Sequence, residues 1–295
     1  MLSMQGDTYM DYKLLVGGSI VYAGRVYSIP NRNVDFKVND IARDFLSHEI
    51  SFTAGASYPS NYYKTFTVAI DGGNSYNYNF YNDWSYVNHS GVYISEPIAE
   101  DIPAGALVPF SYFAEGGGSA SIYANGVSIA SVTVSNSQTR FMTTAQEGVV
   151  YTSGPVKYKG VSACRNNYVI YYINAYGGVD AFMPQHAKMR TDNITSYDMQ
   201  QQYHTGNSEF AQKRYLVDVQ PTWQFNTGWL TDEQSSRMHH LIESPMVYLY
   251  DMAKSVYIPV VMTENSLQYK TWFNQGRKKV SYTFTLKESQ TKQRR

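Results

Sequence analysis

The stretch YVIYYINAY, residues 168–176, carries a strong strand signal. Its first six residues are all β-branched or aromatic, and these types pack well on the half-buried surface of a sheet. Gly177-Gly178 follows directly, and a glycine pair predicts that the strand ends there. We therefore expect this strand to open a β-rich second half of the chain.

The last eighty residues show a clear order of further elements. In residues 280–286 apolar side chains alternate with polar ones, as in a strand with one buried face. The expected strands are 215–225, 246–251, 256–262, 266–273 and 280–286. A polar stretch, residues 191–213, is expected to form a loop or an extended arm between strands.

One helix is expected at about residues 231–244. Thr231 and Gln234 have the spacing of a capping box, in which each side chain bonds the backbone N–H of the other residue. Apolar residues at three- and four-residue spacing predict one buried stripe: Met238, Leu241, Ile242 and Pro245. The last of these, a proline, also predicts the end of the helix.

Two hairpins are expected in the N-terminal half. Residues 66–80 alternate between apolar and polar side chains around a DGGN turn, which predicts one apolar and one solvated face. A second hairpin centres on Asn125-Gly126, a dipeptide that favours a type I′ turn. The alternation then changes parity, which predicts a bulge or a sheet edge near Ala130. A brief helix is expected within residues 38–46.

These elements predict a mostly β protein with minor α content and two domains. The N-terminal domain, residues 1–145, is expected to be β-sandwich-like, with an immunoglobulin-like portion. The C-terminal domain, residues 146–295, is expected to be a split-barrel-like β domain with the one packed helix. The boundary is placed where the sequence turns polar, between residues 136 and 150.

Composition excludes several classes of protein. Twenty-four basic residues balance twenty-four acidic ones, which removes the electrostatic argument for wrapping nucleic acid or lying on an anionic membrane. The 28 tyrosines favour strands and interfaces. Cys164 is the only cysteine, so no internal disulfide framework is expected. We expect no secretory signal, and no apolar run approaches the ~20 residues of a membrane span.

The helix carries two adjacent histidines, which raise the question of a metal site. A zinc-binding helix needs histidines four residues apart, whereas adjacent ones diverge by ~100°. We therefore expect His239, His240 and Glu243 to face solvent or a neighbouring subunit. The basic run Arg277-Lys278-Lys279 is a second candidate interface, or a guard against aggregation of the strand beside it.

Two further sets of residues bear on chemistry. Glu96, Glu100 and Asp101 could form the carboxylate pair of a glycosidase, but Pro97 and Pro103 indicate a loop, and solvated acids are favoured. Tyr76, Tyr78, Tyr81 and Trp84 could stack on sugars, although core packing and an interface are favoured. We expect no catalytic residues, no metal and no cofactor.

Three parts of the chain resemble a known family. They are VYAGRVYSIPNRNVDFKVNDIARDFLS at 21–47, YYINAYGGVDAF at 171–182, and the terminal segments LIESPMVYLYD, IPVVMTENSLQYKTW and GRKKVSYTFTLKES. They resemble structural proteins of Bacteroidales phages, including crAss-like phages. The terminal order of elements is also similar to the split-barrel module of tail-tube, distal-tail and hub proteins, which oligomerise as rings.

The resemblance implies a virion structural protein, a tail or baseplate ring or hub subunit rather than an enzyme. Its expected partners are itself and other virion tail proteins, and its expected site of assembly is the bacterial host cytoplasm. It would have no small-molecule substrate and would touch nucleic acid only incidentally, through the basic C-terminal region. The alternatives are a carbohydrate- or receptor-binding module and a glycan hydrolase.

Overall fold

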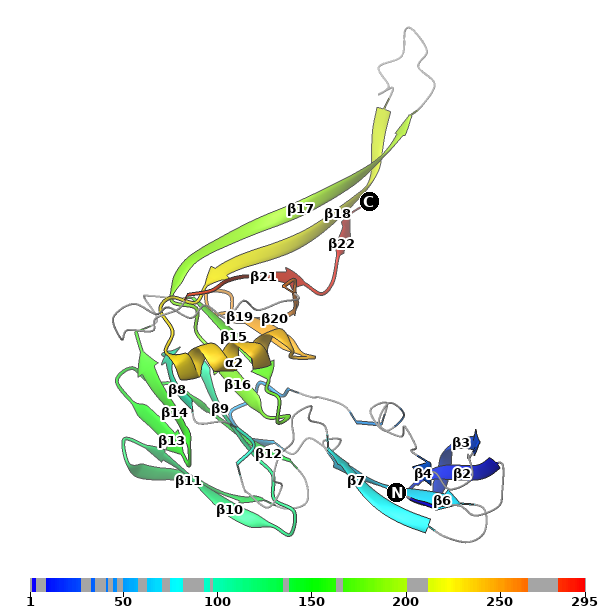
Figure 1. Cartoon of the computed structure of the whole chain (residues 1–295). Coiled ribbons are helices and arrows are strands. Elements are labelled where there is room, and N and C mark those ends of the chain that lie inside the picture. The colour runs from blue at the N-terminus through cyan, green and yellow to red at the C-terminus, as the bar shows by residue number, and fades with distance from the viewer. Residues whose placement is uncertain are drawn as a thin grey trace, which may run out of the picture.

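The computed structural model in Figure 1 describes most of the chain. The described residues are 2–3, 9–27, 33–34, 41, 45–46, 50–57, 63–70, 75–81, 93–95, 98–134, 138–162, 167–200, 212–264 and 281–294. Within them the chain is mostly β, with several sheets and one helix of described bounds, α2. The predicted mostly β fold class is therefore confirmed.

The largest sheet is antiparallel and comes from the second half of the chain. Its strands run in the order β16-β15-β19-β20-β21-β18-β17, and β22 pairs with β18 beyond β21. Their bounds are β15 Tyr168–Ile173, β16 Val179–Phe182, β17 His186–Gln200, β18 Gln212–Asn226, β19 Val247–Asp251, β20 Val256–Met262, β21 Thr283–Glu288 and β22 Lys292–Arg294. Residues 168–173 are thus an inner strand of this sheet.

Strand β15 separates two hydrophobic cores. Val169, Tyr171 and Ile173 point into one core, while Ile170 and Tyr172 point into the other. All five side chains are buried. Burial on both faces explains why the strand is a continuous apolar and aromatic run rather than an alternating one.

The first core lies between β15 and two smaller sheets. One has the order β11-β10-β13-β14-β8 and the other β5-β12-β9. Their bounds are β5 Gly55–Ser57, β8 Ile98–Pro103, β9 Leu107–Tyr112, β10 Gly118–Ala124, β11 Val127–Val134, β12 Thr139–Thr144, β13 Val150–Ser153 and β14 Val156–Val161. The core runs from Ile98 to Ala181, so it crosses the expected domain boundary near residue 145.

The N-terminal residues form a four-stranded sheet beside the body, in the order β3-β2-β6-β7 (Figure 1). The strands are β2 Tyr9–Val16, β3 Ser19–Tyr27, β6 Tyr63–Ile70 and β7 Ser75–Tyr81, and a separate pair joins β1 Leu2–Ser3 to β4 Asn33–Val34. On β6, Phe66 and Val68 are buried, while Thr67 on the other face donates to Asn77 at 2.8 Å. The expected strand pairing and the apolar face of β6 are confirmed, whereas Tyr76 and Tyr78 on the same face of β7 are exposed.

The second predicted hairpin is also confirmed. Asn125 and Gly126 have positive φ angles of 49° and 81°, as a type I′ turn requires. The pairing of β10 with β11 shifts between Ile122 and Tyr123 and leaves Ile129 as an extra residue. The parity change in the sequence is therefore a β-bulge on an edge strand.

One of two expectations about loops fails. Residues 98–103 form strand β8, because their backbone pairs in parallel with β14 even though prolines flank the segment. For residues 191–213 a loop or an extended arm was expected, and the arm is confirmed: the described residues 191–200 and 212–213 belong to β17 and β18, which form the projecting arm of Figure 1. The expected strand 266–273, the turn 71–74, most of the expected helix 38–46 and Cys164 lie outside the described residues.

Helix α2, Asp232–Ile242, begins as predicted. The Gln234 backbone N–H donates to the Thr231 hydroxyl at 3.2 Å, and the Thr231 N–H donates to the Gln234 side chain at 3.0 Å. Met238 and Leu241 are buried, but Pro245 is exposed. Arg237, which the predicted stripe did not include, is buried. The buried face of the helix is therefore rotated toward Arg237 from the predicted stripe.

We predict that Gly160→Ala destabilises the body strongly. A Cβ at Gly160, in β14, would lie 1.8 Å from the carbonyl oxygen of Gln146. Because that obstacle is backbone, relief requires the main chain of β14 or of the turn at 145–149 to move, and overpacking typically costs about 1–3 kcal/mol or more. Denaturant unfolding should show this loss, whereas Ser128→Ala on exposed β11 should change the free energy of unfolding by less than ~0.5 kcal/mol. Equal stabilities for the two variants would contradict the packing.

Candidate functional site

The structure places the helix residues of the predicted interface near the body rather than wholly in solvent. His239 and His240 are half-buried and Glu243 is exposed. The His240 ring packs edge-on against Tyr176, with ring centroids 5.6 Å apart. His240 therefore has an intrachain role that the helical projection did not predict. The other half of that predicted interface, residues 277–279, lies outside the described residues.

The aromatic residues of the predicted glycan platform are not brought together. Tyr76 and Tyr78 are 37% and 45% exposed, and they occupy one face of β7. Tyr81 is on the opposite face, where its ring packs against Phe113 and its hydroxyl donates to Glu115 at 3.1 Å. Tyr81 thus fastens the N-terminal sheet to the body. Trp84 lies outside the described residues.

The acidic candidates are also separated. Glu100 is buried and Asp101 is half-buried, and neighbouring residues of a strand point to opposite faces. Glu100 is therefore not one of the solvated acids that the sequence favoured, because its carboxylate accepts from Arg237 at 3.0 Å inside the protein. Glu96 lies outside the described residues. Glu100 and Asp101 do not form the facing pair that a glycosidase requires.

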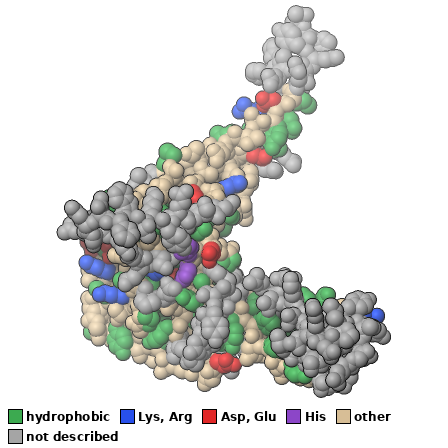
Figure 2. Space-filling view, in the orientation of Figure 1, with side chains coloured by type: hydrophobic (Ala, Val, Ile, Leu, Met, Phe, Trp, Pro, Cys, Tyr) green, Lys and Arg blue, Asp and Glu red, His purple; other side chains and the backbone are tan. Residues whose placement is uncertain are grey.

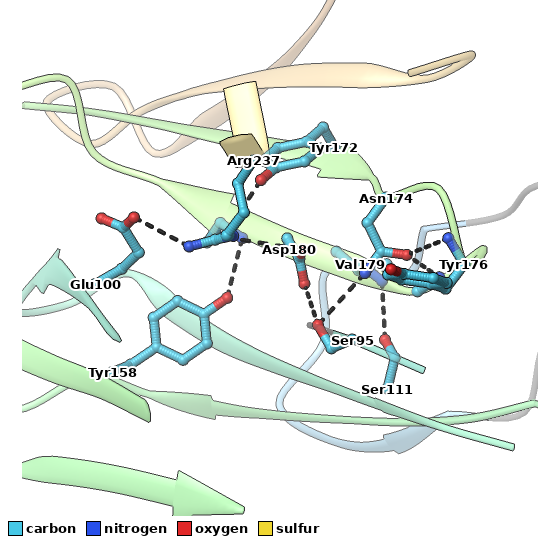
Figure 3. A network of polar contacts seen from close by, with 12 residues as sticks. Ser95, Glu100, Ser111, Tyr158, Tyr172, Asn174, Tyr176, Val179, Asp180 and Arg237 are labelled. Atoms are coloured by element: carbon cyan, nitrogen blue, oxygen red, sulfur yellow. Dashed lines mark hydrogen bonds and ion pairs between the residues drawn. The ribbon is translucent and has the colours of Figure 1, made fainter. Parts of the chain in front are cut away.

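Arg237 is the centre of a buried polar network, drawn in Figure 3. Besides Glu100, its guanidinium lies 3.8 Å from the carboxylate of Asp180 and donates to the Tyr172 hydroxyl at 3.3 Å. Asp180 in turn accepts from the Ser95 hydroxyl at 2.7 Å. The network joins β8, β15, β16 and α2, so it connects the five-stranded sheet to the largest sheet and its helix.

The turn after β15 extends this network. The Asn174 side chain accepts from the backbone N–H groups of Tyr176 and Gly178 at 3.0 and 2.9 Å, and donates to the carbonyl of Ile94 at 3.2 Å. A Cβ at Gly178 would lie 2.4 Å from that same carbonyl. This close approach is a physical reason for a glycine at position 178, and the positive φ of 77° is the reason for Gly177.

Burial dominates the electrostatics of the network. It raises the pKa of Glu100 to about 7, and Arg237 offsets only part of the effect. Burial also raises the pKa of Tyr158 and of Tyr172, so both phenols stay neutral near pH 7. Two carboxyl groups share one guanidinium, and a proton on Glu100 removes the unmatched negative charge. The network is built to hold α2 against the sheets.

The feature best suited to contact another molecule is the arm. Strands β17 and β18 project from the body, and Figure 2 shows hydrophobic side chains along the projection. Its exposed large hydrophobic residues are Met189, Ile194, Tyr197, Met199 and Tyr215, with exposed fractions from 42% to 63%. Exposed apolar side chains gathered on one element mark an interaction site. The sequence signal for this site was the apolar residues scattered through a stretch that looked merely polar.

The charges of the arm are largely matched within the chain. Arg190 pairs with Asp192 at 3.0 Å, and Arg214 pairs with Asp198 at 3.3 Å. The Arg190 guanidinium also lies over the Trp223 ring, 5.7 Å from its centroid. A partner of the arm therefore meets apolar side chains and locally balanced charge.

Two further kinds of site are absent from the described part of the chain. No group of three or more histidine, cysteine, aspartate or glutamate residues there is placed to hold a metal ion. Within the same residues, no helix has the length and apolar character needed to cross a bilayer.

We predict that the network makes stability fall as pH rises. The folded-state pKa of Glu100 lies above its unfolded value, so its contribution is fully present below about pH 4.5 and is lost through about pH 7. The loss should be on the order of 3 kcal/mol, most of it between pH 5 and 8. Glu100→Gln, which mimics the protonated form, should remove this dependence from denaturant unfolding curves.

Glu147→Gln, at an exposed glutamate, serves as the matched control and should leave the pH dependence unchanged. A Glu100→Gln curve parallel to the wild-type curve from pH 5 to 8 would show that Glu100 does not titrate in this range.

Comparison of the sequence with models of protein families finds none that matches, and comparison with curated proteins finds no match either.

Proposed function

We propose that this chain is a virion structural protein, a ring or hub subunit of a phage tail or baseplate that acts through protein–protein assembly. The observation that carries the proposal is the arm, a two-stranded projection with five exposed large hydrophobic side chains. Exposed apolar surface costs free energy in water, so a partner that covers it gains about 25 cal/mol per Å² buried.

The shape of the arm supports a role in assembly. A two-stranded hairpin is marginally stable on its own, and the outer part of β17 and β18 has little of the body beneath it in Figure 1. Oligomers stabilise such extensions by packing them against a neighbour. The resemblance of three chain segments to structural proteins of Bacteroidales phages points in the same direction.

The proposal specifies partners and place. The partners are further copies of this chain in a ring and other tail proteins of the virion, after assembly in the host cytoplasm. Zero net charge suits a subunit that must lie beside identical copies without long-range repulsion. A small-molecule substrate has no part in this function, and nucleic acid contact is incidental.

A carbohydrate- or receptor-binding module is the second candidate. Tyr76 and Tyr78 are neighbours on one face of the edge strand β7, and both rings are accessible. Paired aromatic rings are suited to stack on sugar faces. The candidate is weakened because Tyr81 is held by Phe113 and Glu115 and cannot join them without releasing the N-terminal sheet.

We predict that shortening the arm abolishes assembly. In the variant, an Asn-Gly turn would replace residues 193–220 and connect Asp192 to Pro221, which already face each other. Analytical ultracentrifugation and negative-stain microscopy of wild-type protein, alone and with neighbouring tail proteins, should show oligomers that the shortened variant lacks. Wild-type protein that stays monomeric in both settings, or a shortened variant that assembles normally, would refute the proposal.

A separate experiment addresses the glycan alternative. Tyr76→Ser with Tyr78→Ser should leave assembly unchanged, because these residues lie on the N-terminal sheet and not on the arm. On a glycan array, the wild type and this variant should give the same signal. A signal that disappears in the variant would instead favour the carbohydrate-binding function.

A further inference from the structure

Strand β17 ends the largest sheet and has one unpaired edge. In the sheet order it follows β18, and within the described residues no other strand pairs with it. Its pairing with β18 has shifts only between His186 and Lys188 and between Tyr197 and Asp198. The second shift leaves Tyr215 of β18 as the extra residue, so β17 itself has no inserted residue from Lys188 to Gln200. The backbone N–H and C=O groups along this edge, which no described strand pairs, are a template for another strand.

The sequence of this strand is nearly symmetric about its centre. Residues 189–199 read MRTDNITSYDM, with Ile194 in the middle. Equal steps away from Ile194 reach the opposite charges Arg190 and Asp198, and then the two apolar residues Met189 and Met199. A strand with this pattern complements a second copy of itself that runs in the opposite direction.

We propose that two copies of this chain join through their β17 edges, antiparallel, about a twofold axis at Ile194. The pairing makes one continuous sheet of β18 and β17 with β17 and β18 of the second copy. This inference rests on the proposed role of the arm in assembly and names its partner. It is a β-strand addition between identical chains, in which the backbone supplies the contact and the side chains set the register.

Exposure of the side chains agrees with this arrangement. Ile194 is 63% exposed, and the two methionines Met189 and Met199 are 57% and 47% exposed. In the dimer, Ile194 meets its own copy on one face of the sheet, and Met189 meets Met199 of the second copy on the other. Side chains directly opposite in antiparallel strands have Cβ atoms about 4.5–5.5 Å apart, so each pair covers apolar surface.

Charge selects this register over its neighbours. With the axis at Ile194, Arg190 faces Asp198 of the second copy, and this contact occurs twice. With the axis at Thr195, Asp192 would face Asp198 and like charges would meet. With the axis at Asn193, Asp192 would face Ile194. Opposite charges across strands are favourable and like charges are unfavourable, so the Ile194 register is preferred.

Arg190 and Asp198 can contact a second copy even though each already has an ion-pair partner within its own chain. Arg190 and Asp198 already have the partners Asp192 and Arg214, but the four side chains are 33% to 56% exposed. Exposed ion pairs contribute little individually, so they can be shared with a second copy at small cost. The eleven residues would span about 37 Å, at ~3.4 Å per residue. An edge of this length offers enough backbone for a stable contact.

A twofold contact of this kind joins copies two at a time. It uses only the outer edge of β17, and the faces of the same arms would make the head-to-tail contacts that close a ring. A subunit without ring contacts would stop at the dimer.

Cross-linking through a single cysteine tests the position of the axis. In a Cys164→Ser background, Ile194→Cys places two thiols opposite each other at the axis, where oxidation should link at least half of the chains. Thr191→Cys is the matched control, because its two copies would be about 20 Å apart, six residues at ~3.4 Å. Less than a tenth of that variant should be linked. Equal linking of both variants would overturn the register.

Charge reversal tests the partner itself. Arg190→Asp or Asp198→Arg alone should weaken dimerisation at least tenfold by sedimentation equilibrium, and the two together should restore it to within about threefold. Within one chain each reversal puts a like charge beside Asp192 or Arg214, so recovery in the double variant requires a second copy. Lys157→Asp, at an exposed lysine of β14, should have no effect.

The outcomes separate this inference from the proposed function. If arm shortening abolishes assembly but the double reversal fails to recover, the arm assembles on another surface, and the pairing through Ile194 is wrong. If arm shortening has no effect on assembly, both the pairing and the role of the arm fall together.

Discussion

One buried guanidinium determines how the body of this protein holds together. Arg237 lies between the carboxyl groups of Glu100 and Asp180, which come from two different sheets. Because a buried guanidinium or carboxyl group is costly without its partners, none of the three can move away without the others. Hydrophobic packing on the two faces of β15 is non-directional, so it alone is compatible with several relative positions of the helix and the sheets. The ion network selects one of them, and the arm leaves the body from the same sheet that this network fixes.

The sequence predicted features whose cause is local. The capping box of α2 depends on Thr231 and Gln234, three residues apart, and the type I′ turn depends on Asn125-Gly126 alone. Strand β15 was predictable because its composition is extreme over a short run. In each case the stabilising interaction is made within a few residues, so the pattern appears in the sequence itself.

Features with a distant cause were missed. The burial of Arg237 was not predicted, because its partners Asp180 and Glu100 lie 57 and 137 positions away in the sequence. Strand β8 looked like a loop because of its prolines, yet it pairs in parallel with β14, whose residues come much later. The fastening of Tyr81 to Phe113 was hidden for the same reason. Tertiary contacts override local propensity at these positions.

The arm illustrates a third situation, in which the sequence contained the signal but its polarity obscured it. Most residues of 189–199 are polar or charged, as in a loop, and a strand free on both faces needs no apolar alternation. The charges are matched within the chain by Asp192 and Arg214, which keeps an exposed edge soluble. The same matching leaves apolar side chains as the main surface offered to a partner. An edge protected in this way resists random aggregation yet can accept a strand whose charges have the complementary order, and residues 189–199 themselves have that order.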